Sequence, residues 1–279
     1  MTSYWRQVLA DDFQVPKDRP LDDLTAELTR MLGSTDPRIR DSTAYPALAT
    51  WTDRGVYDDL LSGLGDGMAA GLTVGLGESG TDSVFRRSFS VLLLAECVAR
   101  DNAASLLPPG KILEWGDRVA TWYLRERDLR GFVPGKGWAH AMAHGADALA
   151  ALAESSHLGK AELTVLLDVI GDRITFPAES LLVHGEPDRM ALATINVLRR
   201  NVLPLSIIEP WVARLTSAAT VKAGTADPFL LRGNTEAFLR ALHLQLALGP
   251  NPPAVRSDLL LVVVEALRRT NPHYLATGR

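Results

Sequence analysis

The order of apolar and polar residues along this chain predicts helices. Apolar residues recur three or four positions apart, as at Leu21, Leu24, Leu28, Met31 and Leu32, and no segment shows sustained alternation of apolar and polar positions. A three- to four-residue period places apolar side chains on one face of a helix, whereas a buried strand needs a period of two. The chain is therefore predicted to be all-α.

Helix-start signals recur along the chain at similar distances. Four segments share a polar start, a bulky middle and a small residue about one turn later, and they begin at Asp36, Asp82, Asp188 and Asn234. A fifth helix is expected to begin near Gly137. The resulting period of about 46 to 53 residues suits units of two helices, as in HEAT-like or armadillo-like repeats. A second helix is expected after each of these five starts, at residues 56–72, 111–128, 160–174, 204–220 and 254–270.

These signals predict a single domain over residues 1–279. It would consist of one or two N-terminal helices in residues 1–33, followed by a right-handed stack of helical hairpins in residues 34–279, an α/α superhelix. A compact, irregular helical bundle is the alternative architecture. No segment has the length or composition of an interdomain linker.

Composition narrows the class of protein. The chain has 279 residues, 47% of them hydrophobic and 22% charged, with a net charge of −4. These values are typical of a soluble globular protein without the basic excess of nucleic-acid binders. A single cysteine, Cys97, lies among apolar residues, the start resembles no secretory signal, and the longest apolar run, Leu259 to Val264, is too short to span a membrane. We expect a cytoplasmic protein with neither nucleic acid nor membrane as its partner.

Common catalytic and nucleotide-binding motifs are absent from the sequence. There is no G-x-S-x-G, S-x-x-K or H-E-x-x-H motif. Gly75, Gly77 and Gly80 match G-x-G-x-x-G, but no strand precedes them, so we expect a loop between helices and no dinucleotide site.

The segment from Phe132 to Glu154 contains the strongest candidates for a catalytic or ligand-binding role. If it is one helix, His140, His144 and Asp147 lie within an arc of about 60°, with Trp138 on the opposite side. Alanines flank this stripe and would let neighbouring helices approach closely. We therefore expect the stripe to face a cleft, although an amphipathic helix with its polar stripe in water has the same pattern.

Three chemical interpretations of this stripe remain open. His140 and His144 could bind a divalent metal ion, with Asp147 as a third ligand or as an orienting group. The loop at residues 134–137 could lead into the helix N-terminus, where backbone N–H groups and Lys136 would attract an anionic ligand. A histidine beside Asp147 could act as a general base. A structural role, in which the histidines hydrogen-bond neighbouring loops, is also open.

Four other charged residues have structural explanations. Arg40 and Arg86 occupy matching positions one turn inside repeat helices, which favours i,i+4 pairing and packing between repeats. Glu126 and Asp128 end a predicted helix, where acids oppose the helix dipole. This unfavourable placement could signal a site, but three nearby arginines, Arg125, Arg127 and Arg130, offer the simpler explanation of a mutually neutralised surface.

The sequence also resembles a known family. The stretch WYLRERDLRGFVPGKGWAHAMAHGADAL is similar to the signature of a bacterial family of unknown function, DUF2785, and Lys136 to His140 with His144 and Asp147 form its most specific part. Four further segments extend the similarity over most of the chain. The resemblance implies a soluble, helical, bacterial protein and implies no reaction.

The sequence thus predicts a ligand- or protein-binding module with a polar cleft formed by Lys136, Trp138, His140, His144 and Asp147. The partner would be an unknown protein or a small anionic ligand. A divalent-metal hydrolase that uses His140, His144 and Asp147 is the alternative, so whether the protein is an enzyme stays open.

Overall fold

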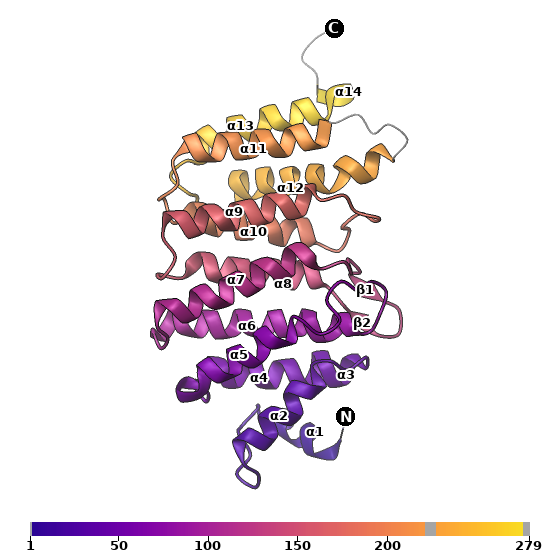
Figure 1. Ribbon diagram of the computed structural model, residues 1–279, viewed down its shortest axis with the longest axis vertical. Coiled ribbons are helices and arrows are strands. Elements are labelled where there is room, and N and C mark those ends of the chain that lie inside the picture. The colour runs from indigo at the N-terminus through magenta and orange to yellow at the C-terminus, as the bar shows by residue number, and fades with distance from the viewer. Residues whose placement is uncertain (1, 221–226, 276–279) are drawn as a thin grey trace. The chain divides into compact units, whose positions relative to one another are not determined.

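The protein is all-α apart from one small sheet. The computed structural model describes residues 2–220 and 227–275 (Figure 1). The chain divides into two compact units, with unit 1 ending at His157 and unit 2 starting at Leu158. That they form one domain stays a prediction.

Unit 1 contains ten helical segments of α, π or 3-10 type and a two-stranded antiparallel sheet in its described residues. Phe132 pairs with Trp138 and Val133 with Gly137 in that sheet. The elements are α1 (Ser3–Ala10), α2 (Leu21–Met31), α3 (Pro37–Ile39), the π-helix η1 (Arg40–Ala44), α4 (Tyr45–Asp53), the 3-10 helix η2 (Asp58–Leu60), α5 (Leu61–Gly71), α6 (Ser83–Ala104), α7 (Pro109–Arg125), β1 (Phe132–Val133), β2 (Gly137–Trp138) and α8 (Ala141–Glu154).

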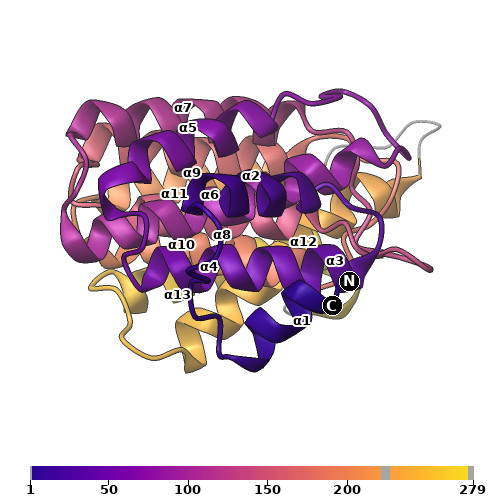
Figure 2. The ribbon, with the colours of Figure 1, turned by 90° about the horizontal axis from the view of Figure 1, so that it is seen from below.

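The helices of unit 1 pack in two layers. α6 packs against α4 and α8, whereas α5 packs against α7, and α5–α6 and α7–α8 contacts join the layers. Figure 2 shows α5 and α7 on one side of the unit and α4, α6 and α8 on the other. Bulky side chains without exposed surface fill the space between the layers, among them Phe85 and Trp115. Close-packed rings of this size provide most of the apolar burial that stabilises such a unit.

Unit 2 contains the remaining helices. They are α9 (Lys160–Thr175), α10 (Glu186–Arg199), α11 (Leu205–Thr220), α12 (Pro228–Leu248), α13 (Arg256–Thr270) and α14 (Pro272–Leu275). α10 packs against α12, α11 against α13, and α9 against α10, α11 and α12. Trp211 of α11 donates a hydrogen bond from Nε1 to the Leu167 carbonyl of α9, at 2.8 Å, which fixes these two helices to each other.

Most predicted helix starts are confirmed within two residues. Asp36 caps α3 by accepting a hydrogen bond from the Arg38 backbone N–H, α6 begins at Ser83, and α10 begins at Glu186. The five helices expected between these starts correspond to α5, α7, α9, α11 and α13, and α1 and α2 lie within residues 1–33. Local capping and period were therefore sufficient for these elements.

The predicted helix start at Asn234 is wrong. α12 begins at Pro228, after Asp227, whose carboxylate accepts a hydrogen bond from the Phe229 backbone N–H. Asn234 lies inside the helix, where its side chain accepts a hydrogen bond from the Leu182 N–H at 2.8 Å. The asparagine therefore anchors the loop before α10 and caps no helix.

The predicted helix start near Gly137 is also wrong. Residues 132–138 form the β1–β2 hairpin, and α8 begins only at Ala141. Gly135 and Gly137 have φ angles of +75° and +77°. Glycine adopts such angles without the steric cost that other residues incur. The two glycines therefore favour a reversal of the chain here in place of a first helical turn.

Two further expectations concern apolar segments. No described helix combines the length and apolarity that crossing a membrane requires. Cys97 has no exposed surface, and burial raises the pKa of its thiol. The expectation of a buried thiol is confirmed.

Candidate functional site

The five predicted site residues lie on three elements. Lys136 is in the turn of the β1–β2 hairpin, Trp138 is in β2, and His140 precedes α8 as its N-cap residue with a φ of 53°. Only His144 and Asp147 are in α8. The expected single helical stripe is therefore broken between His140 and His144, although both histidines remain close to the hairpin.

The hairpin is held against the segment that contains η1. A Cβ atom at Gly137 would lie 2.9 Å from the Cβ of Pro37 and 3.1 Å from a guanidinium nitrogen of Arg40. The absence of a side chain at Gly137 therefore leaves the room that the Pro37 ring and the Arg40 guanidinium occupy. The turn itself is closed by a hydrogen bond from the Lys136 N–H to the Val133 carbonyl, at 3.0 Å.

Arg40 connects the hairpin to the helical layers and has no exposed surface. Its guanidinium donates hydrogen bonds to the carbonyls of Ser34, at 2.6 Å, and Lys136, at 2.7 Å. It also lies 4.2 Å from the ring centre of Phe85 and 4.9 Å from that of Phe89. Cation–π contacts of this kind stabilise a desolvated arginine. Arg40 therefore binds the hairpin across 96 residues of sequence, whereas Asp36, four residues before it, contributes a weaker electrostatic attraction than the adjacent Asp41.

Asp41 is the counter-ion of Arg40. Their Nε and Oδ1 atoms lie 2.6 Å apart. Burial lowers the pKa of Arg40 and raises the pKa of Asp41, while the ion pair and a backbone hydrogen bond from Trp138 act in the opposite direction on Asp41. The charges of this pair are thus balanced locally, and the Trp138 backbone is bound to it.

A second buried ion pair joins α6 to the end of α7. The carboxylate of Glu126 accepts two hydrogen bonds from Arg87, from Nε at 2.5 Å and from Nη2 at 2.8 Å, and neither side chain is exposed. Glu126 also accepts hydrogen bonds from Trp122 Nε1 and from the backbone N–H groups of Arg127 and Asp128, each at 3.0 Å. The expectation of a neutralised surface at Glu126 is wrong, because its partner comes from another helix.

Arg87 also binds the glycine-rich loop between α5 and α6. Its Nη1 donates to the carbonyls of Val74 and Gly75 and to the hydroxyl of Ser83, each at 2.8 Å. The expected loop around Gly75 is confirmed.

Asp128 fixes the segment that leads into β1. Its buried carboxylate pairs with Arg130, whose Nη2 lies 2.6 Å away, and accepts the Gly80 N–H at 3.0 Å. Arg130 in turn donates to the Thr81 carbonyl at 2.6 Å. Pairing of Asp128 with a neighbouring arginine agrees with the sequence, but the burial of Asp128 was not predicted.

Arg86, the other arginine in a matching repeat position, has a separate role. Its Nη1 donates to the carbonyl of Thr29 in α2, and burial lowers its pKa. It therefore joins α6 to α2, so its observed partner belongs to another helix and does not lie four residues away in its own.

Lys136 is paired with an aspartate. Its ammonium lies 2.6 and 2.8 Å from the two carboxylate oxygens of Asp82, the residue before α6. The expectation that residues 134–137 lead directly into a helix N-terminus is wrong, because Trp138, Ala139 and His140 lie between Gly137 and the first residue of α8. The positive charge that was expected to attract an anion is thus compensated by Asp82.

The two histidines lie in a row of rings. Trp138 stacks on His140 at 4.5 Å between ring centres, His140 meets His144 edge-on at 5.7 Å, and His144 meets Phe89 edge-on at 5.1 Å. His140 and His144 are 7% and 6% exposed. The row connects the hairpin with the interior of unit 1.

Hydrogen bonding assigns the proton of His144. Ser88 donates its hydroxyl proton to the Ala139 carbonyl, which can only accept. The same hydroxyl lies 2.8 Å from Nδ1 of His144, so this nitrogen must carry a proton and donate it to Ser88. A nucleophilic serine needs the opposite arrangement, with its own proton directed at the histidine. Ser88 and His144 therefore connect α6 to the start of α8.

The predicted metal ligands do not gather into a metal site. Among the described residues, no group of three or more His, Cys, Asp or Glu side chains has an arrangement that could hold a metal ion. Asp147 lies within α8 and is partly buried.

Comparison with known proteins places the chain in a family. The family model described as "Protein of unknown function (DUF2785)" matches residues 72–244, which is more than half of the chain. The chain belongs to this family. No curated protein and no solved structure matches it.

The matched range of this DUF2785 protein contains the hairpin and most of the buried charged residues that hold it in place. Arg87, Glu126 and Asp128 lie within residues 72–244, whereas Arg40 lies before them. In the described part of the chain, these are the four charged side chains with 0% exposure, and all of them belong to or contact residues 126–138.

One face of the hairpin of the DUF2785 protein is exposed. Phe132 and Trp138 are 50% and 40% exposed, and their rings meet edge-on with 5.1 Å between their centres. Because they are directly paired in the sheet, both side chains lie on the same face. Sequence analysis did not select Phe132, and only the β-hairpin register could have identified it.

Proposed function

We propose that this DUF2785 protein is a non-catalytic binding module that uses the β1–β2 hairpin to contact a protein partner. The proposal includes the HEAT-like superhelix of stacked hairpins as its scaffold and the cytoplasm as its location. The observation that carries it is the exposed pair of Phe132 and Trp138 on a hairpin held by buried charges. Aromatic side chains of this kind dominate the energetics of many protein interfaces.

The rigidity of the hairpin supports the proposal. Trp138 is fixed on one side by its stack on His140 and on the other by Phe132. Its backbone bonds to Asp41, which pairs with the buried Arg40. A contact residue that is already ordered loses little conformational entropy when it binds, which increases affinity.

The surroundings of the hairpin favour binding over chemistry. Ser88 is fully buried, and its hydroxyl proton is directed at a carbonyl. No observation favours the divalent-metal hydrolase, since the described residues contain no suitable ligand group. A small anion is also disfavoured as the partner, because Lys136 is neutralised by Asp82. A protein surface with an apolar centre fits the exposed rings better.

The first experiment tests whether a partner covers Trp138. The chain has six tryptophans, and Trp138 is 40% exposed whereas the other five are at most 5% exposed. Quenching of tryptophan fluorescence by acrylamide therefore reports mainly on Trp138. A partner that binds the hairpin should decrease this quenching, and a bound partner that leaves the quenching unchanged would contradict the proposal.

The second experiment identifies partners that depend on the hairpin. Immobilised full-length protein captures interacting proteins, which are quantified for the wild type, for Phe132→Ser/Trp138→Ser and for Leu113→Ser. Leu113 lies on α7 and is also 40% exposed, so it is a matched control. We expect a protein that the wild type and the control retain and that the double variant loses at least about 10-fold. Equal capture of every protein by all three variants would refute the proposal.

A further inference from the structure

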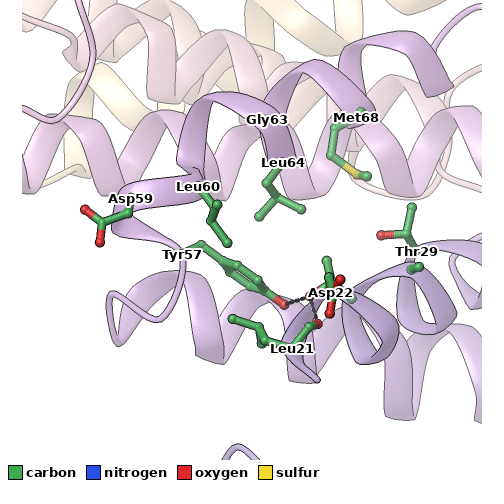
Figure 3. Close-up of a pocket in the computed structure, with 12 residues that line it drawn as sticks. Leu21, Asp22, Thr29, Tyr57, Asp59, Leu60, Gly63, Leu64 and Met68 are labelled. Atoms are coloured by element: carbon green, nitrogen blue, oxygen red, sulfur yellow. Dashed lines mark hydrogen bonds between the residues drawn. The ribbon is translucent and has the colours of Figure 1, made fainter. Parts of the chain in front are cut away.

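A second surface of unit 1 has the features of a docking groove. A groove of about 450 Å³ lies between α2 and the η2–α5 segment, outside the range matched by the family model. Figure 3 shows its apolar lining and the labelled residues around it. The apolar side chains that line it include Leu21, Leu60, Leu64 and Met68. Leu60 is 55% exposed and adds to the apolar surface that these neighbouring side chains present to a partner.

The wall of this groove on the α2 side is fixed. The hydroxyl of Tyr57 lies 2.8 Å from that of Thr25, which donates to the Leu21 carbonyl at 2.7 Å. Tyr57 is only 2% exposed. The groove is therefore a built feature of the unit, with polar atoms of its wall already satisfied and an apolar surface left for a partner.

Glycines on α5 keep the groove open. Gly65 and Gly71 have a packing reason, because a Cβ atom would lie 2.1 Å from Trp115 and 2.2 Å from Ser90. Gly63 and Gly67 line the groove, and a Cβ atom at either position would have no atom within 4 Å. Glycine inside a helix is less stable than alanine, so packing within the unit does not explain these two.

The i,i+4 spacing of Gly63 and Gly67 indicates what approaches them. Residues four apart lie on one face of a helix, one turn above the other. Two glycines in that arrangement leave a flat strip that allows the backbone of another helix to come close. An amphipathic helix places its apolar face in such a groove.

The charges around the groove indicate which charged residues the partner helix would carry. Asp22 and Asp59 line the groove, and no lysine or arginine is among its lining residues. Both aspartates are exposed, and neither forms an ion pair within the part of the chain that the structure describes. A partner with lysine or arginine beside its apolar face would therefore be complementary. We propose that the groove between α2 and α5 binds a basic amphipathic helix of a partner protein.

The test uses two synthetic helical peptides and the full-length chain. The probes are fluorescein-labelled 16-residue amphipathic helices, one of leucine and lysine and one of leucine and glutamate. Fluorescence anisotropy measures their dissociation constants. We expect the leucine–lysine peptide to bind at least about 10-fold more tightly, with affinity falling as salt increases. Equal affinity of the two peptides would overturn the proposal.

Variants locate the binding in the groove. Gly63→Gln/Gly67→Gln places two side chains in open space and should weaken the leucine–lysine peptide at least about 10-fold, while the thermal unfolding midpoint stays the same or rises. Gly110→Gln is the matched control, because Gly110 is a helical glycine in α7 with no atom within 4 Å of its Cβ position. Unchanged affinity in the double variant would overturn the proposal.

Three further measurements test the charge argument and separate other occupants and the hairpin surface. Asp22→Asn/Asp59→Asn should weaken the leucine–lysine peptide and reduce its salt dependence, and an unchanged salt dependence would contradict the charge argument. Sedimentation of the wild type tests for a second copy of the chain in the groove. Self-association that disappears in Gly63→Gln/Gly67→Gln would overturn the proposal of a foreign helix. Phe132→Ser/Trp138→Ser should leave peptide affinity unchanged, which distinguishes this groove from the hairpin surface.

Discussion

Replacement of Glu126 by glutamine should destabilise unit 1 strongly. The substitution keeps the shape of the side chain and removes its charge. The carboxylate of Glu126 accepts five hydrogen bonds, from Arg87 twice, from Trp122 and from the two following backbone N–H groups. Each of its oxygens accepts at least two of these bonds, so the amide NH₂ of glutamine would point at donors whichever way it turned.

The magnitude follows from burial. Arg87 and Glu126 are both 0% exposed, so Glu126→Gln leaves the Arg87 charge in the interior without its counter-ion. Removing one partner of a buried pair typically costs about 3–5 kcal/mol. Because Arg87 keeps its bonds to Val74, Gly75 and Ser83, we expect the lower half of this range, about 3–4 kcal/mol.

The matched control is Glu114→Gln on the same helix. Glu114 pairs with Lys111 and Arg118, and its side chain is 43% exposed. Exposed pairs contribute about 0–1 kcal/mol, so this variant should lose no more than that. The two variants therefore differ in burial and share helix, residue type and chemical change.

Urea unfolding followed by tryptophan fluorescence measures both free energies. All tryptophans except Trp211 lie in unit 1, so the signal reports mainly on this unit. The double variant Arg87→Met/Glu126→Gln completes the comparison and should cost less than the sum of its single changes. If Glu126→Gln costs no more than Glu114→Gln, the buried pair is not the support of the hairpin that we infer.

Three further predictions concern single positions. Gly137→Ala should lower the free energy of unfolding by at least about 1 kcal/mol more than Gly135→Ala does in the same assay. Both glycines have a positive φ, but only at Gly137 would a Cβ atom lie 2.9 Å from Pro37. Equal losses in the two variants would contradict this close contact. Burial raises the pKa of Tyr57 to about 12, so the folded state favours the neutral phenol. The contribution of this group to the free energy of unfolding is fully present below about pH 10 and is lost as pH rises toward 12. A Tyr57→Phe variant should lack this part of the pH dependence in urea titrations. Nitrogen NMR at neutral pH should find His144 protonated on Nδ1, and a neutral ring with its proton on Nε2 alone would refute the hydrogen-bond assignment.

Local signals in the sequence predict a helix start correctly where an aspartate is followed by a proline. The Asp36–Pro37 pair correctly indicated a helix start, and the same pair of residue types at Asp227–Pro228 marks the true start of α12. The Gly233–Asn234 pair also resembles a cap before a periodic run, but the asparagine serves a contact 52 residues away. Periodicity indicated the longer helices but not short segments such as η2 and α14, and a cap-like pair alone does not distinguish a helix start from a position inside a helix.

The support of the hairpin could not be predicted, because it depends on contacts between distant segments. Glu126 has three arginines close to it in sequence, which suggests a surface of mixed charge, but its partner Arg87 lies 39 residues away. Arg40 reaches the hairpin across 96 residues. Helical periodicity specifies which face a residue occupies and gives no information about which other helix it meets. Proline and glycine at residues 134–137 were the available sign that helix α8 begins later than its apolar pattern suggested.

The energetics of these buried charges connect the fold with the proposed function. Buried ion pairs add little net stability, because desolvation offsets their attraction, and apolar residues of similar volume often perform as well. Stability alone therefore does not explain why the wholly buried Arg40, Arg87, Glu126 and Asp128 gather around one short hairpin. Charged partners differ from apolar ones in tolerating few alternative arrangements, since any other position leaves a charge unpaired. At this hairpin, that restriction determines where the exposed ring of Trp138 lies, which is the property that a binding surface needs.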